Sequence, residues 1–492
     1  MKKLLTCFLL LGSAGMLAAQ SLKLANTLQS GMVIQQQQPL HIWGTASPGA
    51  TVEIKADWSE HTHLTKAAAG GEWGIDVQVP ATQPGNFTQH RVSVSSKGRS
   101  IWLDSLLIGD VWLCSGQSNM DMTLKPFLPW LLGALHFERE IEYADRPQIR
   151  LYDVTTDFSA TPRNDCAGTW KVCSPSTAAD FSALAYFFAR DVFDRTKIPV
   201  GLVVSSLGGS SGQAWVSRDS LQQDKILNEA YLYPYDTSSR SKEMLDATVT
   251  FEKVVRPTLL YNAMIYPLQH LRFKGILWYQ GESNRRDSSL YTRLGSSLIR
   301  NWRNLFRQPE LPFYYVQVAP YNWMENDSTA FEYALLREAQ GKIRDQVPHT
   351  AMALTMDIAD PNDIHPRNKQ DLAYRLAHIA LAKDYGITGL IYQGPAFKEA
   401  IPADTVIKVR FKESSLGSGL TTNDSQPPRH FFVAGADHIF HPAEARIEGN
   451  EVWLQSADVL RPVAVRYAFT NFPVTNLCNK EGFPAEPFRS SF

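Results

Sequence analysis

The order of apolar and polar residues divides the chain into three stretches of different character. Residues 20–105 contain short runs in which apolar and polar residues alternate, as in 51–56 and 90–96, separated by turns rich in Gly, Pro and Asn. Alternation with a period of two and frequent turn signals are typical of antiparallel strands, so we predict a β-sandwich-like domain here. Residues 391–492 return to this pattern, which predicts a second all-β domain at the C-terminal end.

The middle stretch, residues 106–390, has a different pattern. Its apolar runs lack alternation and lie at 106–114, 149–154, 199–206, 274–280, 312–319 and 350–356. Such runs fit strands that are buried on both faces of a parallel sheet. Between or after them, apolar residues recur at helical spacing, most clearly in 181–192, 291–302 and 372–380. The succession predicts an α/β domain with helices on both faces of the sheet, where ligands bind at the carboxyl ends of the strands.

The N-terminal residues have the pattern of a secretory signal peptide. Lys2 and Lys3 precede an apolar run at 4–11, and small residues follow up to Ala19. The run is short for a membrane span, and no stop-transfer flank follows it. We therefore predict that residues 1–19 are a cleaved signal peptide and that the protein is periplasmic or secreted, without a membrane span.

Composition narrows the classes of partner and cofactor. The chain of 492 residues has a formal net charge of −1 and no long basic run, which argues against nucleic-acid binding. Without Cys7 of the signal peptide, Cys114 is predicted to be a buried thiol, whereas Cys166 and Cys173 could be bridged or free. No Cys-x-x-Cys pair and no His pair with metal-ligand context are present, so no metal or organic cofactor is predicted.

Four polar segments follow strand-like runs and are candidates for one active site. They are GQSNM at 116–120, GGSSGQAW at 208–215, WYQGESN at 278–284 and DIHP at 363–366. A serine between a buried strand and a helix exposes its hydroxyl near free backbone N–H groups. Ser118 alone is better explained as a helix cap, but four such segments in this order favour a nucleophile at Ser118.

The later segments contain the groups that a nucleophilic serine needs. An imidazole has an ordinary pKa of about 6.5, which suits a general base, and His365 lies in the last segment. Asp363, or else Asp360, could orient its ring. A glycine turn can present backbone N–H groups to an oxyanion, and the amide of Asn284 can donate to the same oxyanion. Taken singly, the glycine segment is better explained as a turn between a strand and a helix, and Asn284 also suits a helix cap.

The same four segments resemble those of the SGNH hydrolase superfamily, and most closely its sialate O-acetylesterase branch. GDVWLCSGQSNM at 109–120 is similar to the nucleophile block of that branch, and 363–377 is similar to its histidine block. The resemblance implies a flavodoxin-like parallel sheet flanked by helices. It also implies Ser118 as nucleophile, His365 as base, and an oxyanion hole of the Ser118 and Gly208 (or Gly209) amides and the Asn284 side chain.

The match departs from the superfamily at one position. Many members carry an aspartate three residues before the histidine, where this chain has Asn362. The resemblance therefore leaves the third member of the triad open. It is Asp363, the more distant Asp360, or a backbone carbonyl group.

The function implied by the resemblance is hydrolysis of O-acetyl esters of sialic acids through an acetyl-serine intermediate. An esterase for other acetylated glycans, such as xylan, would share the motifs, and a non-catalytic glycan-binding protein is the alternative from another class. A sialic acid carries a carboxylate, which an arginine would bind well. Arg285 and Arg286, directly after Asn284, are the candidates by position.

Overall fold

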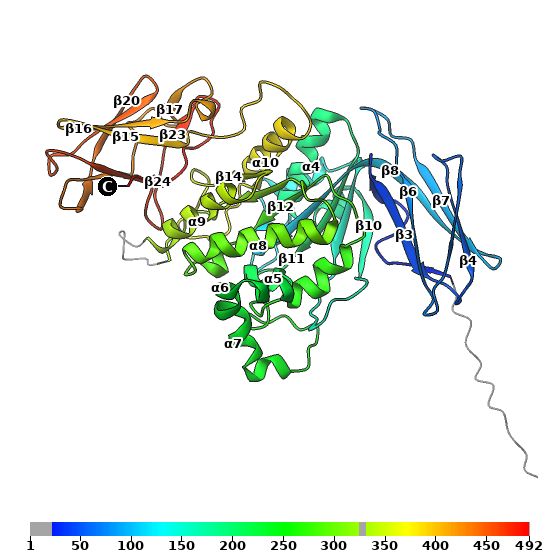
Figure 1. Cartoon of the computed structure of the whole chain (residues 1–492). Helices are drawn as coiled ribbons and strands as arrows, with labels where there is room; N and C mark the ends of the chain where they lie inside the picture. The colour runs from blue at the N-terminus through cyan, green and yellow to red at the C-terminus, as the bar shows by residue number, and fades with distance from the viewer. Residues whose placement is uncertain (1–21, 324–330, 492) are drawn as a thin grey trace, which may run out of the picture.

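The computed structural model describes residues 22–323 and 331–491, so the predicted signal peptide lies outside the described residues. Three sections follow one another along the molecule, with a β section at each end and the α/β section between them (Figure 1). The order is the one that the apolar pattern predicts. Among the described residues, no helix is long and apolar enough to cross a membrane.

The N-terminal section consists of antiparallel sheets. One sheet has the order β1 (Lys23–Leu24), β3 (Pro39–Thr45), β6 (Glu72–Gln78); in the other, β5 (Thr62–Lys66), β4 (Thr51–Ala56) and β7 (His90–Ser96) lie side by side, and β7 pairs with β8 (Arg99–Gly116). Alternate residues of β4 are buried, among them Val52 and Ile54, because successive side chains of a strand point to opposite faces. The predicted strands of this section are confirmed.

Strand β8 joins this section to the next without a break. Its first half pairs with β7, residues 107–109 pair with β2 (Val33–Gln35), and residues 110–116 enter the central sheet. The boundary predicted between residues 105 and 106 falls inside this strand. The strand that ends beside Ser118 is therefore anchored in both sections.

The central sheet has the order β10-β9-β11-β8-β12-β13-β14. Its further strands are β9 (Arg146–Val154), β10 (Gly168–Cys173), β11 (Val200–Ser206), β12 (Gly275–Tyr279), β13 (Phe313–Val316) and β14 (Thr350–Ala353). All neighbours from β9 to β14 are parallel, and only the edge strand β10 is antiparallel. Every residue of β11, β12 and β13 is buried, as their unbroken apolar runs predict.

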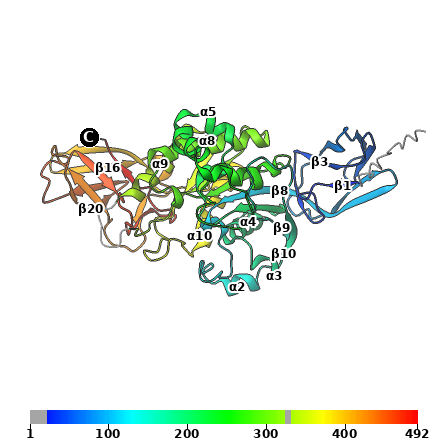
Figure 2. The same cartoon turned by 90° about the horizontal axis from the view of Figure 1, so that it is seen from below.

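Helices cover both faces of this sheet (Figures 1 and 2). α4 (Ala183–Thr196) and α10 (Lys369–Lys383) share an apolar core with one face, and α8 (Ser289–Phe306) and α9 (Glu332–Gln346) share a core with the other. Shorter helices lie in the connections: α1 (Ser118–Asp121), α2 (Phe137–Glu142), α3 (Pro175–Ala178), α5 (Arg218–Gln223), α6 (Lys225–Leu227) and α7 (Tyr233–Asp236).

The C-terminal section contains three small antiparallel sheets. Their orders are β15 (Phe397–Ala403), β16 (Val406–Phe411), β21 (Glu451–Gln455), β20 (Glu444–Glu448); β19 (Phe440–Pro442), β18 (Phe431–Ala434), β22 (Ala464–Tyr467), β24 (Phe488–Arg489); and β17 (Leu420–Thr422), β23 (Leu477–Asn479). Arg489 donates to Glu338 of α9 at 2.8 Å, which ties this section to the central one.

The cysteines of the described residues are all buried thiols, namely Cys114, Cys166, Cys173 and Cys478. The prediction for Cys114 is confirmed. Of the two alternatives for Cys166 and Cys173, the structure has the free thiols. Burial raises the pKa of both, so neither thiol is readily ionised at neutral pH.

Candidate active site

The four polar segments come together at one edge of the central sheet. β8, β11 and β12 are neighbours in the sheet and parallel, so the segments that follow them leave from the same edge. The fourth segment follows β14 and leads into α10. The topology therefore places residues 118, 208, 284 and 365, which are distant in sequence, around one region.

Ser118 is the first residue of α1, directly after the turn at the end of β8. Gly116 has a φ of +143°, and a Cβ atom there would lie 2.1 Å from the Tyr279 carbonyl oxygen. Only glycine fits this close approach. Ser118 Oγ lies 2.9 Å from His365 Nε2, which is hydrogen-bonding distance. The serine and histidine singled out in the sequence thus lie within the distance that a nucleophile–base pair requires.

Asp363 lies on the other side of the imidazole ring. Its Oδ1 is 3.4 Å from His365 Nδ1 and accepts a hydrogen bond of 2.8 Å from the His365 backbone N–H. Burial opposes ionisation of the Asp363 carboxyl, but the hydrogen bonds from His365 outweigh it and hold the pKa below its ordinary value. The other candidate, Asp360, accepts from the backbone N–H of Asn362. The geometry favours Asp363 as the acid that faces His365.

The glycine turn after β11 lies against the serine. A Cβ atom at Gly208 would be 3.7 Å from Ser118 Cβ, so this backbone borders the nucleophile. Asp121, one turn after Ser118, accepts a 2.9 Å bond from Ser206 Oγ. Burial raises the pKa of the Asp121 carboxyl, against hydrogen bonds from Ser206 and the Gly208 backbone that lower it. The Gly208 amide is thus oriented toward Asp121, while Gly209 turns with a φ of +74°.

The side chain of Asn284 does not match the geometry expected of an oxyanion donor. Its Nδ2 donates to Gln213 Oε1 at 3.0 Å and to Asp287 Oδ2 at 2.8 Å. Its Oδ1 accepts from the Gly212 backbone at 2.8 Å and from Gln280 Nε2 at 2.7 Å. Both amide hydrogens are therefore engaged by the protein. This is expected, because a buried polar group is stabilised by hydrogen bonds. Asn284 therefore braces the loop between β12 and α8 in this structure.

Gln117, beside the serine, holds the same loop in place, and sequence reasoning did not single it out. Its backbone N–H donates to Tyr279 O at 3.0 Å. Its Oε1 accepts from Gln280 Nε2 at 3.1 Å and from the backbone of Gly281 at 3.3 Å. These bonds connect the segment after β8 to the segment after β12. The amide-rich composition of both motifs is the only sequence signal for the connection.

Asn119, on the other side of the serine, connects it to the histidine loop and was also missed. Its Nδ2 donates to Glu282 Oε1 at 2.6 Å and to the carbonyl of Ile364, the neighbour of His365, at 3.1 Å. Its Oδ1 accepts from Lys369 Nζ at 2.6 Å. Asn119 thus links the nucleophile helix to the residue before His365, which sets the relative position of the pair.

Lys369 and Glu282 are buried beneath this connection. Burial lowers the pKa of Lys369 to about 7, although the negative charges of Glu282 and Asp363 act in the opposite direction. Burial also raises the pKa of Glu282, against the hydrogen bond from Asn119 and the charges of His365 and Lys369. Nothing in the sequence distinguishes Lys369 from an exposed lysine at the start of a helix.

Of the two arginines after Asn284, Arg285 is half-buried and Arg286 is exposed. The Arg285 guanidinium lies 4.1 Å from the centre of the Trp323 ring, a cation–π contact. Within residues 22–323 and 331–491, no carboxylate pairs with Arg285. The two arginines therefore differ in burial and in their contact with Trp323.

Comparison with known proteins adds independent information. Residues 108–382 match the family described as carbohydrate esterase, sialic acid-specific acetylesterase. The sialate O-acetylesterase of Mus musculus is 30% identical over 423 residues, which cover 77% of this chain and 76% of that protein. The human sialate O-acetylesterase is 29% identical over 402 residues, with coverages of 76% and 73%. The crystal structure of a carbohydrate acetylesterase from Xanthomonas citri superposes with a TM-score of 0.82 at 34% identity, over 95% of this chain and 99% of that one.

Proposed function

This chain belongs to the sialic acid-specific acetylesterase family of carbohydrate esterases, and we propose that it deacetylates sialic acids by serine catalysis. It is a carboxylic ester hydrolase that acts as an acetylesterase on carbohydrates. The alternative of a non-catalytic glycan-binding protein is therefore set aside. We propose three further points: that the substrate is a sialic acid, that the reaction passes through an acetyl-serine, and that the protein is exported.

The proposed reaction begins at Ser118, and the 2.9 Å separation of Ser118 Oγ from His365 Nε2 is the observation that carries it. His365 Nε2 takes the hydroxyl proton while Oγ attacks the acetyl carbonyl carbon. The carbonyl π electrons move to oxygen and return as the bond to the sugar oxygen breaks, and His365 protonates that oxygen. Water, deprotonated by His365, then hydrolyses the acetyl-serine, which releases acetate and restores the hydroxyl. Asp363 accepts from Nδ1–H and stabilises the imidazolium.

The oxyanion of each tetrahedral intermediate is held by backbone groups in this proposal. The Ser118 N–H is at the first position of α1, where helical N–H groups have no partner within the helix. The Gly208 N–H is engaged by Asp121, so the second N–H in this proposal is that of Gly209, in the turn that borders Ser118. Asn284 has the bracing role that its four hydrogen bonds indicate, in place of the donor role expected from the resemblance.

We assign the central section to the SGNH hydrolases with a flavodoxin-like sheet. If β8, β11, β12, β13 and β14 are numbered one to five in chain order, their order in the sheet is 2-1-3-4-5. This is the flavodoxin-like order, with β9 and β10 added at the edge. The strand order supports the assignment.

Arg285 is the group that we propose to bind the carboxylate of the sialic acid. A guanidinium that is stacked on an aromatic ring loses little further freedom when it binds a carboxylate. Arg286 is exposed and lacks the stacking contact. A neutral glycan such as xylan has no use for this cation, so Arg285 supports sialic acid over the alternative.

The test compares acetate release from an O-acetylated sialic acid and from acetylated xylan. We expect the wild type to prefer the sialic acid and Ser118→Ala to lose at least about 10³-fold in kcat/KM on both substrates, with an unchanged circular dichroism spectrum. A preference for xylan would overturn the sialic acid assignment. Activity of folded Ser118→Ala near the wild-type level would overturn the serine mechanism.

The same assay tests the carboxylate site. Arg285→Gln is expected to raise KM for the sialic acid by roughly 10-fold, the loss of one charge-assisted contact, and to leave xylan unchanged. Arg286→Gln is the matched control and should leave both substrates unchanged. Equal effects of the two variants would contradict the role of Arg285.

We also propose export through cleavage of residues 1–19, which the charged, apolar and small-residue pattern supports. N-terminal sequencing of the mature protein from its native host should begin at Gln20. A mature protein that retains Lys2 would contradict the proposal.

A further inference from the structure

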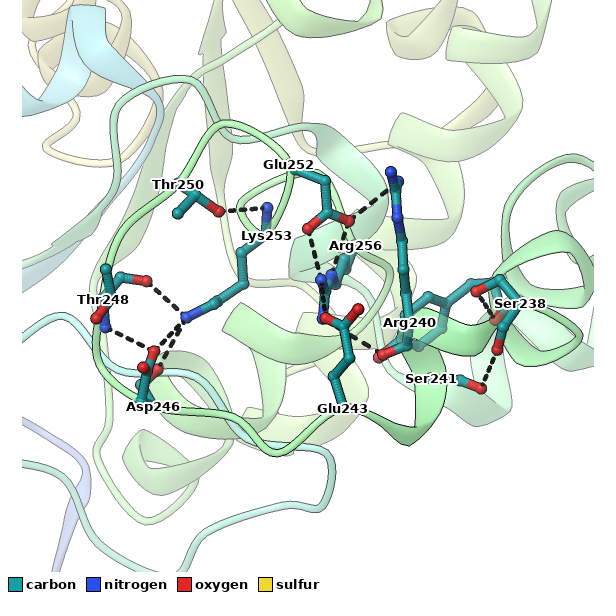
Figure 3. A network of polar contacts seen from close by, with 11 residues as sticks. Ser238, Arg240, Ser241, Glu243, Asp246, Thr248, Thr250, Glu252, Lys253 and Arg256 are labelled. Carbon is teal, nitrogen blue, oxygen red and sulfur yellow. Dashed lines mark hydrogen bonds and ion pairs between the residues drawn. The ribbon is translucent and has the colours of Figure 1, made fainter.

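A long connection beside the glycine turn is crossed by the hydrogen bonds of two buried cations. Lys253 is buried and its Nζ lies 2.5 Å from Asp246 Oδ1 and 2.6 Å from the Thr248 carbonyl oxygen (Figure 3). Arg256 is also buried and donates to Glu252 at 2.9 Å and to Glu243 at 2.5 Å. All these partners come from residues 243–256, so the two cations fold the connection onto itself through charge-assisted bonds.

The connection presents a largely exposed aromatic ring to solvent. Phe251 stands between Glu252 and Thr250, both part of the network, and is 75% exposed. Burial of an aromatic ring stabilises a folded protein, and most of the Phe251 ring stays exposed in this segment. An exposed ring of this size therefore suggests that it contacts a ligand.

The ring lies against the turn that borders the nucleophile. A Cβ atom at Gly209 would be 3.1 Å from Cδ1 and Cε1 of Phe251, so the ring edge contacts that residue. Gly208, the preceding residue, borders Ser118 on its own side. The carbonyl oxygen of Gly209 accepts a 2.8 Å bond from Ser283 Oγ, which holds the turn in place. Phe251 is therefore at the rim of the site, because it contacts Gly209 and the preceding residue, Gly208, borders Ser118.

We infer that Phe251 is a specificity-determining residue whose ring packs against the apolar C–H face of the sugar that carries the acetyl ester. The inference rests on the proposed function, in which Ser118 attacks that ester. Aromatic rings bury a large apolar area with few rotatable bonds, and the backbone on both sides of Phe251 belongs to the ion-paired connection. The contact is made with the sugar and not with the acetyl group, so it discriminates sugar esters from simple esters.

The test uses two acetyl esters, an O-acetylated sialic acid and ethyl acetate, which has no ring. Phe251→Ala should lower kcat/KM for the sugar ester roughly 10-fold, mainly through KM, and leave ethyl acetate hydrolysis unchanged. Phe251→Tyr should restore the sugar activity, because it keeps the ring. Met244→Ala is the matched control, since Met244 is 96% exposed on the same connection, and it should change neither substrate.

The outcomes separate this inference from the proposed function. Unchanged sugar activity in Phe251→Ala, or an equal loss on both esters, would overturn the inference, since the second result indicates a displaced turn. Activity that persists in Ser118→Ala would instead overturn the serine mechanism.

Discussion

At the scale of the residue, the site is organised by side chains that orient other side chains. Asp363 accepts from the backbone of His365 and faces its ring nitrogen with the same oxygen. One carboxylate oxygen therefore fixes both the loop and the ring. With Asn at position 362, the spacing of two residues places Asp363 Oδ1 3.4 Å from Nδ1 of His365.

Asp363→Asn tests this role. The asparagine oxygen can still accept the backbone bond, but it cannot stabilise an imidazolium by charge, so we expect kcat to fall by at least roughly 10²-fold with the fold unchanged. The assay is steady-state hydrolysis of p-nitrophenyl acetate. Asp360→Asn is the control and should stay near the wild-type rate. A loss below about 10-fold in Asp363→Asn would indicate that a backbone carbonyl orients His365 instead.

At the scale of the element, α1 and α10 are joined below the site by Asn119 and Lys369. The 2.6 Å bond between them places a buried ammonium group at the start of α10. Burial is the largest influence on this group and lowers its pKa to about 7. The lysine thus costs folding free energy whenever it must be charged inside the protein.

The free energy of unfolding should depend on pH through Lys369. Between about pH 7 and 10.5 the unfolded chain binds the Lys369 proton and the folded chain does not, so this group makes stability rise with pH. Lys369→Met removes the effect. Its stability relative to the wild type should increase as pH falls from about 10 to 7.

Urea unfolding of both proteins at several pH values measures this difference. Lys342→Met changes an exposed lysine that pairs with Glu338 on α9, and it should give a flat difference. A flat difference for Lys369→Met as well would show that Lys369 is charged in the folded protein throughout this range.

At the scale of the whole molecule, the sections differ in how they are joined. One apolar core runs from Val33 and Ile42 of the N-terminal section to Ile276 and Trp278 of the central sheet, and β8 passes through both. The C-terminal section has a core of its own. The N-terminal section is therefore part of the support of the strand that ends at Ser118, whereas the C-terminal section is attached through contacts such as Arg489 with Glu338.

The sequence by itself was sufficient for the parallel strands of the central sheet and for the helices that contain 181–192, 291–302 and 372–380. Periodicity is a local property, and each buried run or amphipathic segment carries its own signal. The segments with Ser118 and His365 could also be found, because they directly follow or precede such elements. The antiparallel edge strand β10 and helix α9 were not predicted from periodicity.

Only the tertiary structure decided which polar groups of distant segments bind one another. The amide of Asn284 could have faced an oxyanion, but Gln213, 71 positions away, is one of the groups that engage it. The Lys369 amine is buried and bonded to Asn119, 250 positions away, a partner that the sequence does not indicate. Phe251 reached the glycine turn only through the fold of its connection. Such contacts depend on which segments meet in three dimensions, and a hydrogen bond or a buried charge leaves no periodic signal in the chain.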